Sequence, residues 1–70
     1  MRLTVNGEAR VIEHGSTVGM LVSTLAPRHD GTTRGVAVAV EGVVVPRSQW
    51  DCTELAPEAV VEVLTAVQGG

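Results

Sequence analysis

The sequence predicts one α+β domain, with a mixed sheet of four to five strands and one main helix packed on one face. Three observations support this. The chain has 70 residues, which suits one small domain with a limited core. Its composition, 44% hydrophobic and 19% charged, is typical of a globular chain. Short segments of strand character lie on both sides of a segment with helical spacing.

The first thirteen residues predict a β-hairpin. Arg2–Val5 alternates polar and apolar residues, and Asn6-Gly7 follows directly. Asn-Gly is a strong hairpin signal because both central positions of the turn need a positive φ. Residues 8–13 would form the returning strand.

A helix is predicted next. Ser16 or Thr17 supplies the N-cap, because a hydroxyl there can accept a hydrogen bond from the first turn. Pro27 ends the helix soon after Leu25, because proline has no backbone N–H. Apolar residues at helical spacing place one face against a sheet, namely Val18, Leu21, Val22 and Leu25.

Residues 36–40 predict a third strand, in which valine and alanine alternate. The period of two places the valines on one face and Ala37 and Ala39 on the other. Glu41-Gly42 is a turn into residues 43–45, and Pro46 ends that short strand.

The remaining segments complete the sheet. Residues 46–55 are irregular, with a 3₁₀ turn near 48–50, and Val60–Val67 is a strongly β-prone last strand. The first and last strands form a parallel central pair, because the residues between them supply the long crossover that such pairing needs. A β-grasp fold is the simplest solution. It leaves Ala37 and Ala39 on an uncovered, mildly apolar face that suits partner docking.

Composition excludes several classes of function. The net charge is −3 and Trp50 is the single aromatic residue, which argues against nucleic-acid binding. No signal peptide or long apolar run is present, so we expect no membrane association and a cytoplasmic location.

Several reactive side chains have ordinary interpretations. His14 and His29 are too far apart in sequence for common metal-ligand spacing, so no metal site is predicted. Asp51 and Glu54 have no companion group for acid–base chemistry, and Cys52 has no neighbouring Lys or His to activate its thiol.

The C-terminal Gly69-Gly70 is the feature that carries chemistry. Residues 1–67 form the predicted domain, and residues 68–70 form a flexible Gln-Gly-Gly tail. Without a Cβ, the terminal peptide can thread a narrow channel and present its carboxylate to a nucleotide in a partner. Adenylation by ATP would activate that carboxylate, and a sulfur nucleophile would give a thiocarboxylate on Gly70. A frayed tail without a role is the alternative.

The chain resembles the ThiS family of sulfur carriers, which are ubiquitin-like β-grasp proteins. Three segments carry the resemblance: the alternating strand Val36–Val40, Val45-Pro46-Arg47-Ser48-Gln49-Trp50, and the C-terminal run Val61–Gly70. One departure is Ala56-Pro57-Glu58-Ala59, where such proteins often carry an Asp-Gly-Asp-like turn. Pro57 suits the second position of a type I turn.

The resemblance implies a protein that is a co-substrate and not itself an enzyme. A ThiF-like adenylyltransferase would use ATP to adenylate Gly70, and a cysteine desulfurase system would supply the sulfur. A ThiG-like thiazole synthase would then use the thiocarboxylate, which is 1-thioglycine at Gly70. Gly69 and Gln68 would thread the partner's channel, and no cofactor would be bound by the chain itself.

Two residues have more than one possible role, and three alternative functions stay open. Trp50 packs on a small core beside Pro46 or anchors a partner, and Arg47 is a solvated or backbone-bonding charge or else contacts a partner. The alternative functions are a carrier like the small subunit of molybdopterin synthase, a ubiquitin-like modifier joined to lysines through Gly70, and a β-grasp interaction module with an idle tail.

Overall fold

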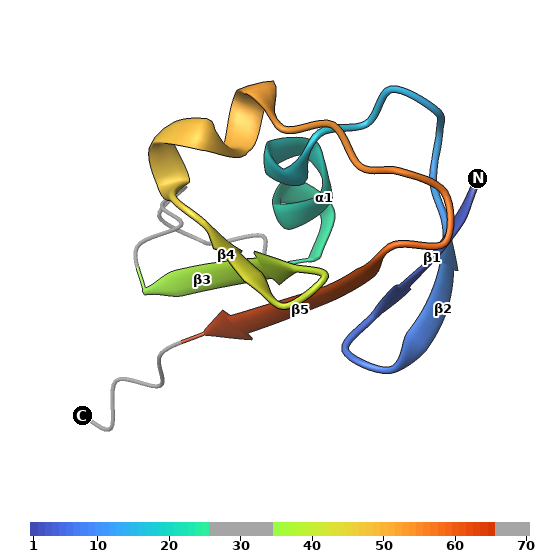
Figure 1. Ribbon diagram of the computed structural model, residues 1–70, viewed down its shortest axis with the longest axis horizontal. Helices are drawn as coiled ribbons and strands as arrows, with labels where there is room; N and C mark the ends of the chain where they lie inside the picture. The colour runs from blue at the N-terminus through green and yellow to red at the C-terminus, as the bar shows by residue number, and fades with distance from the viewer. Residues whose placement is uncertain (26–34, 66–70) are drawn as a thin grey trace.

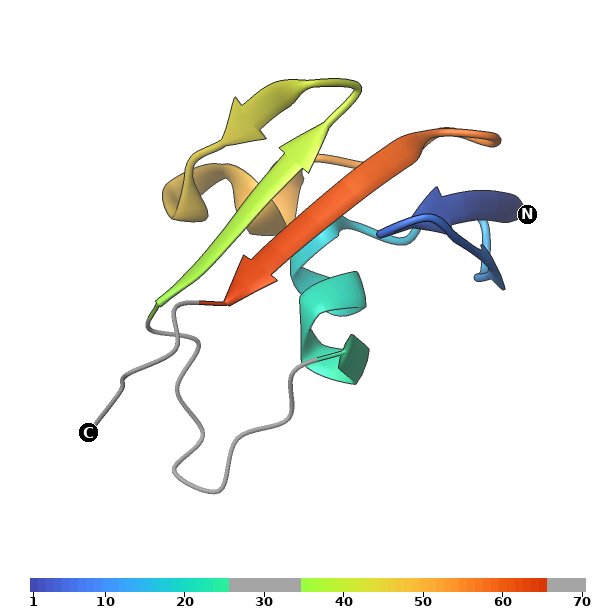
Figure 2. The same ribbon diagram turned by 90° about the horizontal axis from the view of Figure 1, so that it is seen from below.

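The computed structural model describes residues 1–25 and 35–65. They form a five-stranded sheet in the order β2-β1-β5-β3-β4, with α1 on one side of it (Figure 1). β1 and β5 are parallel at the centre, and the other pairs are antiparallel (Figure 2). The predicted β-grasp topology is confirmed. The elements are β1 (Arg2–Val5), β2 (Glu8–Val11), α1 (Val18–Leu25), β3 (Val36–Val40), β4 (Val43–Val45), the 3₁₀ helix η1 (Arg47–Cys52) and β5 (Val60–Thr65).

The first hairpin forms as its turn residues predict. Asn6 and Gly7 have φ values of 52° and 83°, and Val5 pairs with Glu8 across the turn. β2 ends at Val11, two residues before the expected end. The backbone pairing nevertheless continues by one residue, because the Ile12 N–H donates to the Met1 carbonyl at 2.8 Å.

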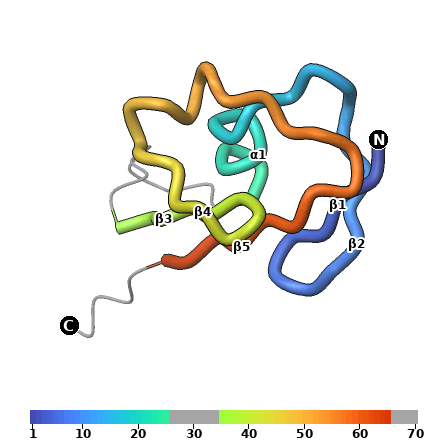
Figure 3. Tube along the Cα trace, in the orientation of Figure 1, coloured from blue at the N-terminus to red at the C-terminus, as the bar shows by residue number. Residues whose placement is uncertain are grey.

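Thr17 is the N-cap of α1. Its Oγ1 accepts a hydrogen bond from the Met20 N–H at 3.2 Å, whereas the Ser16 hydroxyl donates to the Glu13 carbonyl. α1 ends at Leu25, and Pro27 lies outside the described residues. Residues 53–55 lie beside the start of this helix (Figure 3), where the Val18 N–H donates to the Thr53 carbonyl at 2.9 Å.

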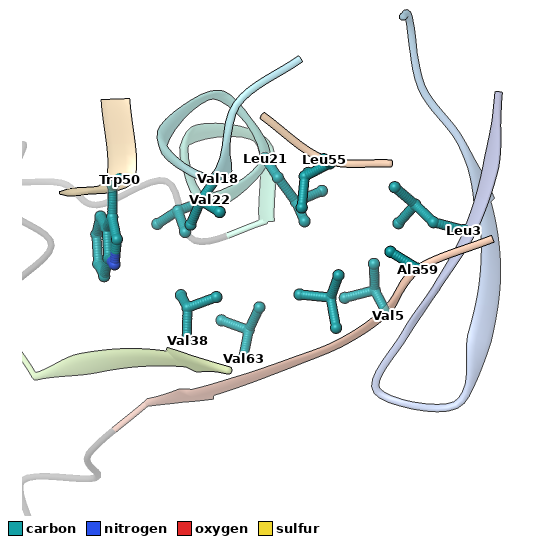
Figure 4. Packing of buried hydrophobic residues seen from close by; sticks show 11 residues of the cluster. Leu3, Val5, Val18, Leu21, Val22, Val38, Trp50, Leu55, Ala59 and Val63 are labelled. Carbon is teal, nitrogen blue, oxygen red and sulfur yellow. The ribbon is translucent and has the colours of Figure 1, made fainter. Parts of the chain in front are cut away.

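The core lies between the sheet and α1 (Figure 4). The predicted helical face is buried at three positions and half-buried at Leu25, and Val38 is the buried valine of β3. Burial of these side chains is the main stabilising term in a domain of this size. The buried apolar residues are Leu3, Val5, Val18, Leu21, Val22, Val38, Trp50, Leu55, Ala59, Val61 and Val63.

Glu41, in the turn of the second hairpin, holds the start of β5 through both its side chain and its backbone. Glu41 and Gly42 have φ values of 51° and 80°, as a two-residue turn between paired Val40 and Val43 requires. The Glu41 carboxylate accepts a hydrogen bond from the Val60 N–H at 2.7 Å. The Glu41 N–H donates to the Val60 carbonyl at 2.8 Å, so this turn fixes where β5 begins.

The turn that precedes β5 has a geometry that the sequence left open. The Ala59 N–H donates to the Ala56 carbonyl at 3.2 Å, with Pro57 in the second position as predicted. However, Glu58 in the third position has a φ of 66°, and a type I turn needs a negative value there. The turn is therefore type II, in which glycine is the favoured third residue.

Replacing Glu58 with glycine is expected to stabilise the domain. A residue with a Cβ in the left-handed region costs about 1–2 kcal/mol, and glycine removes this cost. The relief exceeds the roughly 0.5–1 kcal/mol that is lost because glycine has more freedom in the unfolded chain. The melting temperature of Glu58→Gly should therefore rise by about 4 °C, measured by circular dichroism. Glu58→Gln removes the charge and keeps the strained φ, so an equal rise in that control would contradict the explanation.

Candidate functional site

The predicted carrier residues Gln68, Gly69 and Gly70 lie outside the described residues, as does the predicted end of the last strand at Val67. The structure instead describes the strand that leads to them. β5 is the central strand of the sheet, and it is described as far as Thr65. The position of the tail relative to the domain therefore depends on what holds the end of β5.

Both sides of β5 are held close to its end. On one side, β3 pairs along the strand as far as Val36 opposite Thr65. On the other side, β1 has already ended at Val5, and the side chain of Asn6 takes the place of a strand residue. Its Nδ2 donates to the Val63 carbonyl at 3.0 Å, and its Oδ1 accepts from the Val63 N–H at 2.8 Å. Asn6 thus has a second role, besides the turn, that sequence reasoning did not find.

The sheet face opposite α1 carries the predicted docking residues. The register places Ala37 beside Leu64, and places Ala39 between Glu62 of β5 and Val44 of β4. Alternate residues of the same strands are buried under α1. We call this surface the outer face. Its residues are Arg2, Thr4, Ala9, Val11, Ala37, Ala39, Val44, Val60, Glu62 and Leu64.

The outer face is strongly apolar. Leu64 and Val44 are each 68% exposed, Val11 is 81% exposed and Val60 is 48% exposed. Ala37 is exposed and Ala39 is half-buried. Leu64, Ala37, Ala39 and Val44 adjoin one another through the pairing of β5, β3 and β4, and adjoining exposed apolar side chains of this kind mark interaction surfaces. Val60, Glu62 and Leu64 were not predicted as part of it, although their period of two becomes informative once the pairing of β3 with β5 is known.

Trp50 belongs to the core. It is 6% exposed, and its indole Nε1 donates to the Val45 carbonyl at 2.9 Å. The Arg47 guanidinium lies 5.3 Å from the centre of the ring, a cation–π distance. This position fits the core interpretation of Trp50 and leaves little of its surface for the alternative role in docking.

The other reactive side chains of the described residues lie exposed at the surface. Cys52 is exposed, and its thiol donates weakly to the Gln49 carbonyl at 3.4 Å. His14, Asp51 and Glu54 are exposed, and His29 lies outside the described residues. Within residues 1–25 and 35–65, no three His, Cys, Asp or Glu side chains lie close enough together to hold a metal ion.

A hollow of about 260 Å³ lies between the first hairpin and the end of α1. It is smaller than the usual ~300–1,000 Å³ of small-molecule sites, and it combines the opposite charges of Glu8 and Arg10. The hollow therefore offers no substrate site of ordinary size. None of the described helices is both long and apolar enough to cross a membrane.

Comparison with known proteins adds family information to this geometry. The model of the ThiS family matches residues 3–70. The chain is similar to the crystal structure of the thiamine biosynthesis protein (ThiS) from Geobacter metallireducens, with 30% identity, a TM-score of 0.77 and 100% coverage of both chains. A solution NMR structure of a thiamine biosynthesis protein from the same organism matches with 30% identity, a TM-score of 0.77, and coverage of 100% of this chain and 88% of that chain. No curated protein gives a significant match.

Proposed function

The chain belongs to the ThiS family, and from this we propose that it is the sulfur carrier for the thiazole moiety of thiamine. Gly70 would carry the sulfur as a thiocarboxylate. The observation that carries the proposal is the family match, which extends through the C-terminal Gly69-Gly70. The fold supports it, because the strand that leads to the tail is the central strand of the sheet.

The proposed chemistry divides between the chain and its partners. The Gly70 carboxylate attacks the α-phosphorus of ATP in a ThiF-like adenylyltransferase, and pyrophosphate leaves. The outer sulfur of a persulfide from a cysteine desulfurase system then attacks the acyl carbon, and AMP leaves. A thiol cleaves the resulting acyl disulfide, which releases the thiocarboxylate and leaves a disulfide between the thiol and the donor cysteine. The resulting thiocarboxylate donates its sulfur to a ThiG-like thiazole synthase. In this scheme the chain supplies the reacting carboxylate, and its partners supply ATP and catalysis.

The outer face is the proposed surface by which the adenylyltransferase recognises the chain. It carries Ala37, Ala39 and the exposed side chains of Val44, Val60 and Leu64. Small residues on β3 allow close approach of a partner, and removing the larger apolar side chains from water favours binding. Because β5 both contributes to this face and leads to residues 66–70, docking here would direct the tail toward the partner.

Ala37→Asp is expected to weaken binding to the ThiF-like adenylyltransferase by about 100-fold, because an unpaired carboxylate would be buried in an apolar contact. Ala37 is preferable to Ala39 because Ala39 lies opposite Glu62, where a second acid would destabilise the sheet. Binding is measured by titration calorimetry, and adenylation by ATP–pyrophosphate exchange that depends on the carrier.

Met20→Asp is the matched control. Met20 is 56% exposed on α1, away from the outer face, so the same change of charge there should leave affinity within about twofold. Equal affinity of Ala37→Asp and the unmodified chain would contradict docking through the outer face.

A further inference from the structure

Glu62 places one carboxylate in the middle of the apolar outer face. It lies on the central strand β5, with the exposed Val60 and Leu64 two residues away on either side. Across the sheet it pairs with Ala39, and Ala39 pairs with Val44. The other charged residue of the outer face, Arg2, pairs with Val11 at the far end, so it is not in a neighbouring row.

The Glu62 carboxylate makes no hydrogen bond or ion pair in the described part of the chain. In water this costs nothing, because an exposed carboxylate is fully hydrated. The situation changes when a partner covers the outer face. A buried carboxylate without a cation is strongly unfavourable, whereas one paired and hydrogen-bonded to a cation is tolerated.

We propose that the surface of the adenylyltransferase that covers the outer face presents one Arg or Lys side chain, set among apolar residues, which pairs with Glu62. This inference rests on the proposed function. Glu62 is then a specificity-determining residue: apolar contacts around it supply affinity, and the single charge selects a partner with a matching cation. The net charge of −3 also favours approach to a basic surface.

The same carboxylate argues against a second copy of this chain as the occupant. If two outer faces met around a two-fold axis near the middle of β5, their Glu62 side chains would be brought together. Like charges in such a contact are repulsive, and burial strengthens the repulsion. Glu62 would therefore keep an otherwise apolar face available for a different protein.

Glu62→Gln tests the proposal with little change in shape. The probe is the ThiF-like adenylyltransferase from the same genome, titrated with the full-length carrier. The variant should bind about 10- to 100-fold more weakly than the unmodified chain, and its affinity should depend less on salt. Glu54→Gln removes the same charge from an exposed position away from the outer face, and its affinity should stay within about twofold.

A double-mutant cycle identifies the cation. Each Arg and Lys on the surface of the enzyme is replaced by Ala and tested with both carriers, and one of them should show a coupling of about tenfold or more with Glu62. In sedimentation experiments, Glu62→Gln should self-associate more than the unmodified chain. Unaltered melting of the variant shows that its fold is intact.

The experiments distinguish failure of the cation proposal from failure of the proposed carrier function. If Glu62→Gln binds as tightly as the unmodified chain while both are adenylated, the cation proposal is overturned and the carrier function stands. The absence of any coupled cation would also overturn it. An unmodified chain that neither binds the enzyme nor is adenylated overturns both proposals.

Discussion

Removing Gly70 is expected to abolish adenylation and leave the domain folded. The shortened chain would end one residue earlier, and its carboxylate would be retracted by about 3.3–3.6 Å. Because a misplacement of about 1 Å can reduce a reaction rate about 100-fold, this retraction should reduce carrier-dependent ATP–pyrophosphate exchange below detection. The described core ends at Val63, so the melting temperature should not change.

Gly70→Ala is the matched control, because it keeps the length of the chain and adds one methyl group. It separates the effect of tail length from the effect of an added side chain. A carboxylate at the correct distance with a Cβ beside it should retain more activity than the shortened chain. Normal exchange by the chain without Gly70 would contradict the role proposed for this residue. A large fall in its melting temperature would show that the tail contributes to folding.

Replacing Trp50 with Ala is expected to unfold most of the protein at 37 °C. The ring is 6% exposed, donates a hydrogen bond to the Val45 carbonyl and contacts Arg47. Removing a buried Trp lowers the free energy of unfolding by about 3–5 kcal/mol, which equals what a core of this size supplies in total. Loss of dispersed amide signals in NMR spectra would show the unfolding.

Trp50→Phe keeps most of the buried ring and loses the indole N–H. The Val45 carbonyl would then lack its donor, so a smaller loss of about 1–3 kcal/mol is expected, with the fold retained. If Trp50→Ala melted within a few degrees of the unmodified chain, the ring would not be the core residue that the structure indicates.

Local patterns in the sequence determined most of the fold. Asn6-Gly7 predicts the first hairpin because its φ values are a property of the two residues themselves, and the turn forms as expected. The apolar spacing of residues 18–25 predicts the buried helical face, and the alternation of residues 36–40 separates the buried Val38 from Ala37 and Ala39. Each of these predictions needs only neighbouring residues, so one sequence suffices.

Features that join distant residues were not predicted. The Asn6 side chain binds the Val63 backbone, and its ability to do so depends on β5 extending past the end of β1. Glu62 is central to the outer face only because β5 is the central strand and pairs with β3 in one register. The type II turn requires a positive φ at Glu58, and a glutamate at that position gave no reason to expect one.

The residues of the candidate site also differ in whether local sequence patterns could predict them. Ala37 and Ala39 could be placed on the uncovered face from their period of two. The role proposed for Gly70 rests on the chemistry of a terminal carboxylate and on resemblance to a family, because the groups that would react with it belong to other proteins. The family match includes residue 70, and the role of that residue stays a proposal.

The most direct test of the carrier function is the intact mass of the chain after incubation with the ThiF-like adenylyltransferase, ATP, a cysteine desulfurase, cysteine and a thiol reductant. The proposal predicts a mass increase equal to replacement of one oxygen by one sulfur, located by fragmentation at Gly70. An unchanged mass under conditions that support ATP–pyrophosphate exchange would contradict it. Conjugates joined through Gly70 to lysines of other proteins would instead identify a ubiquitin-like modifier.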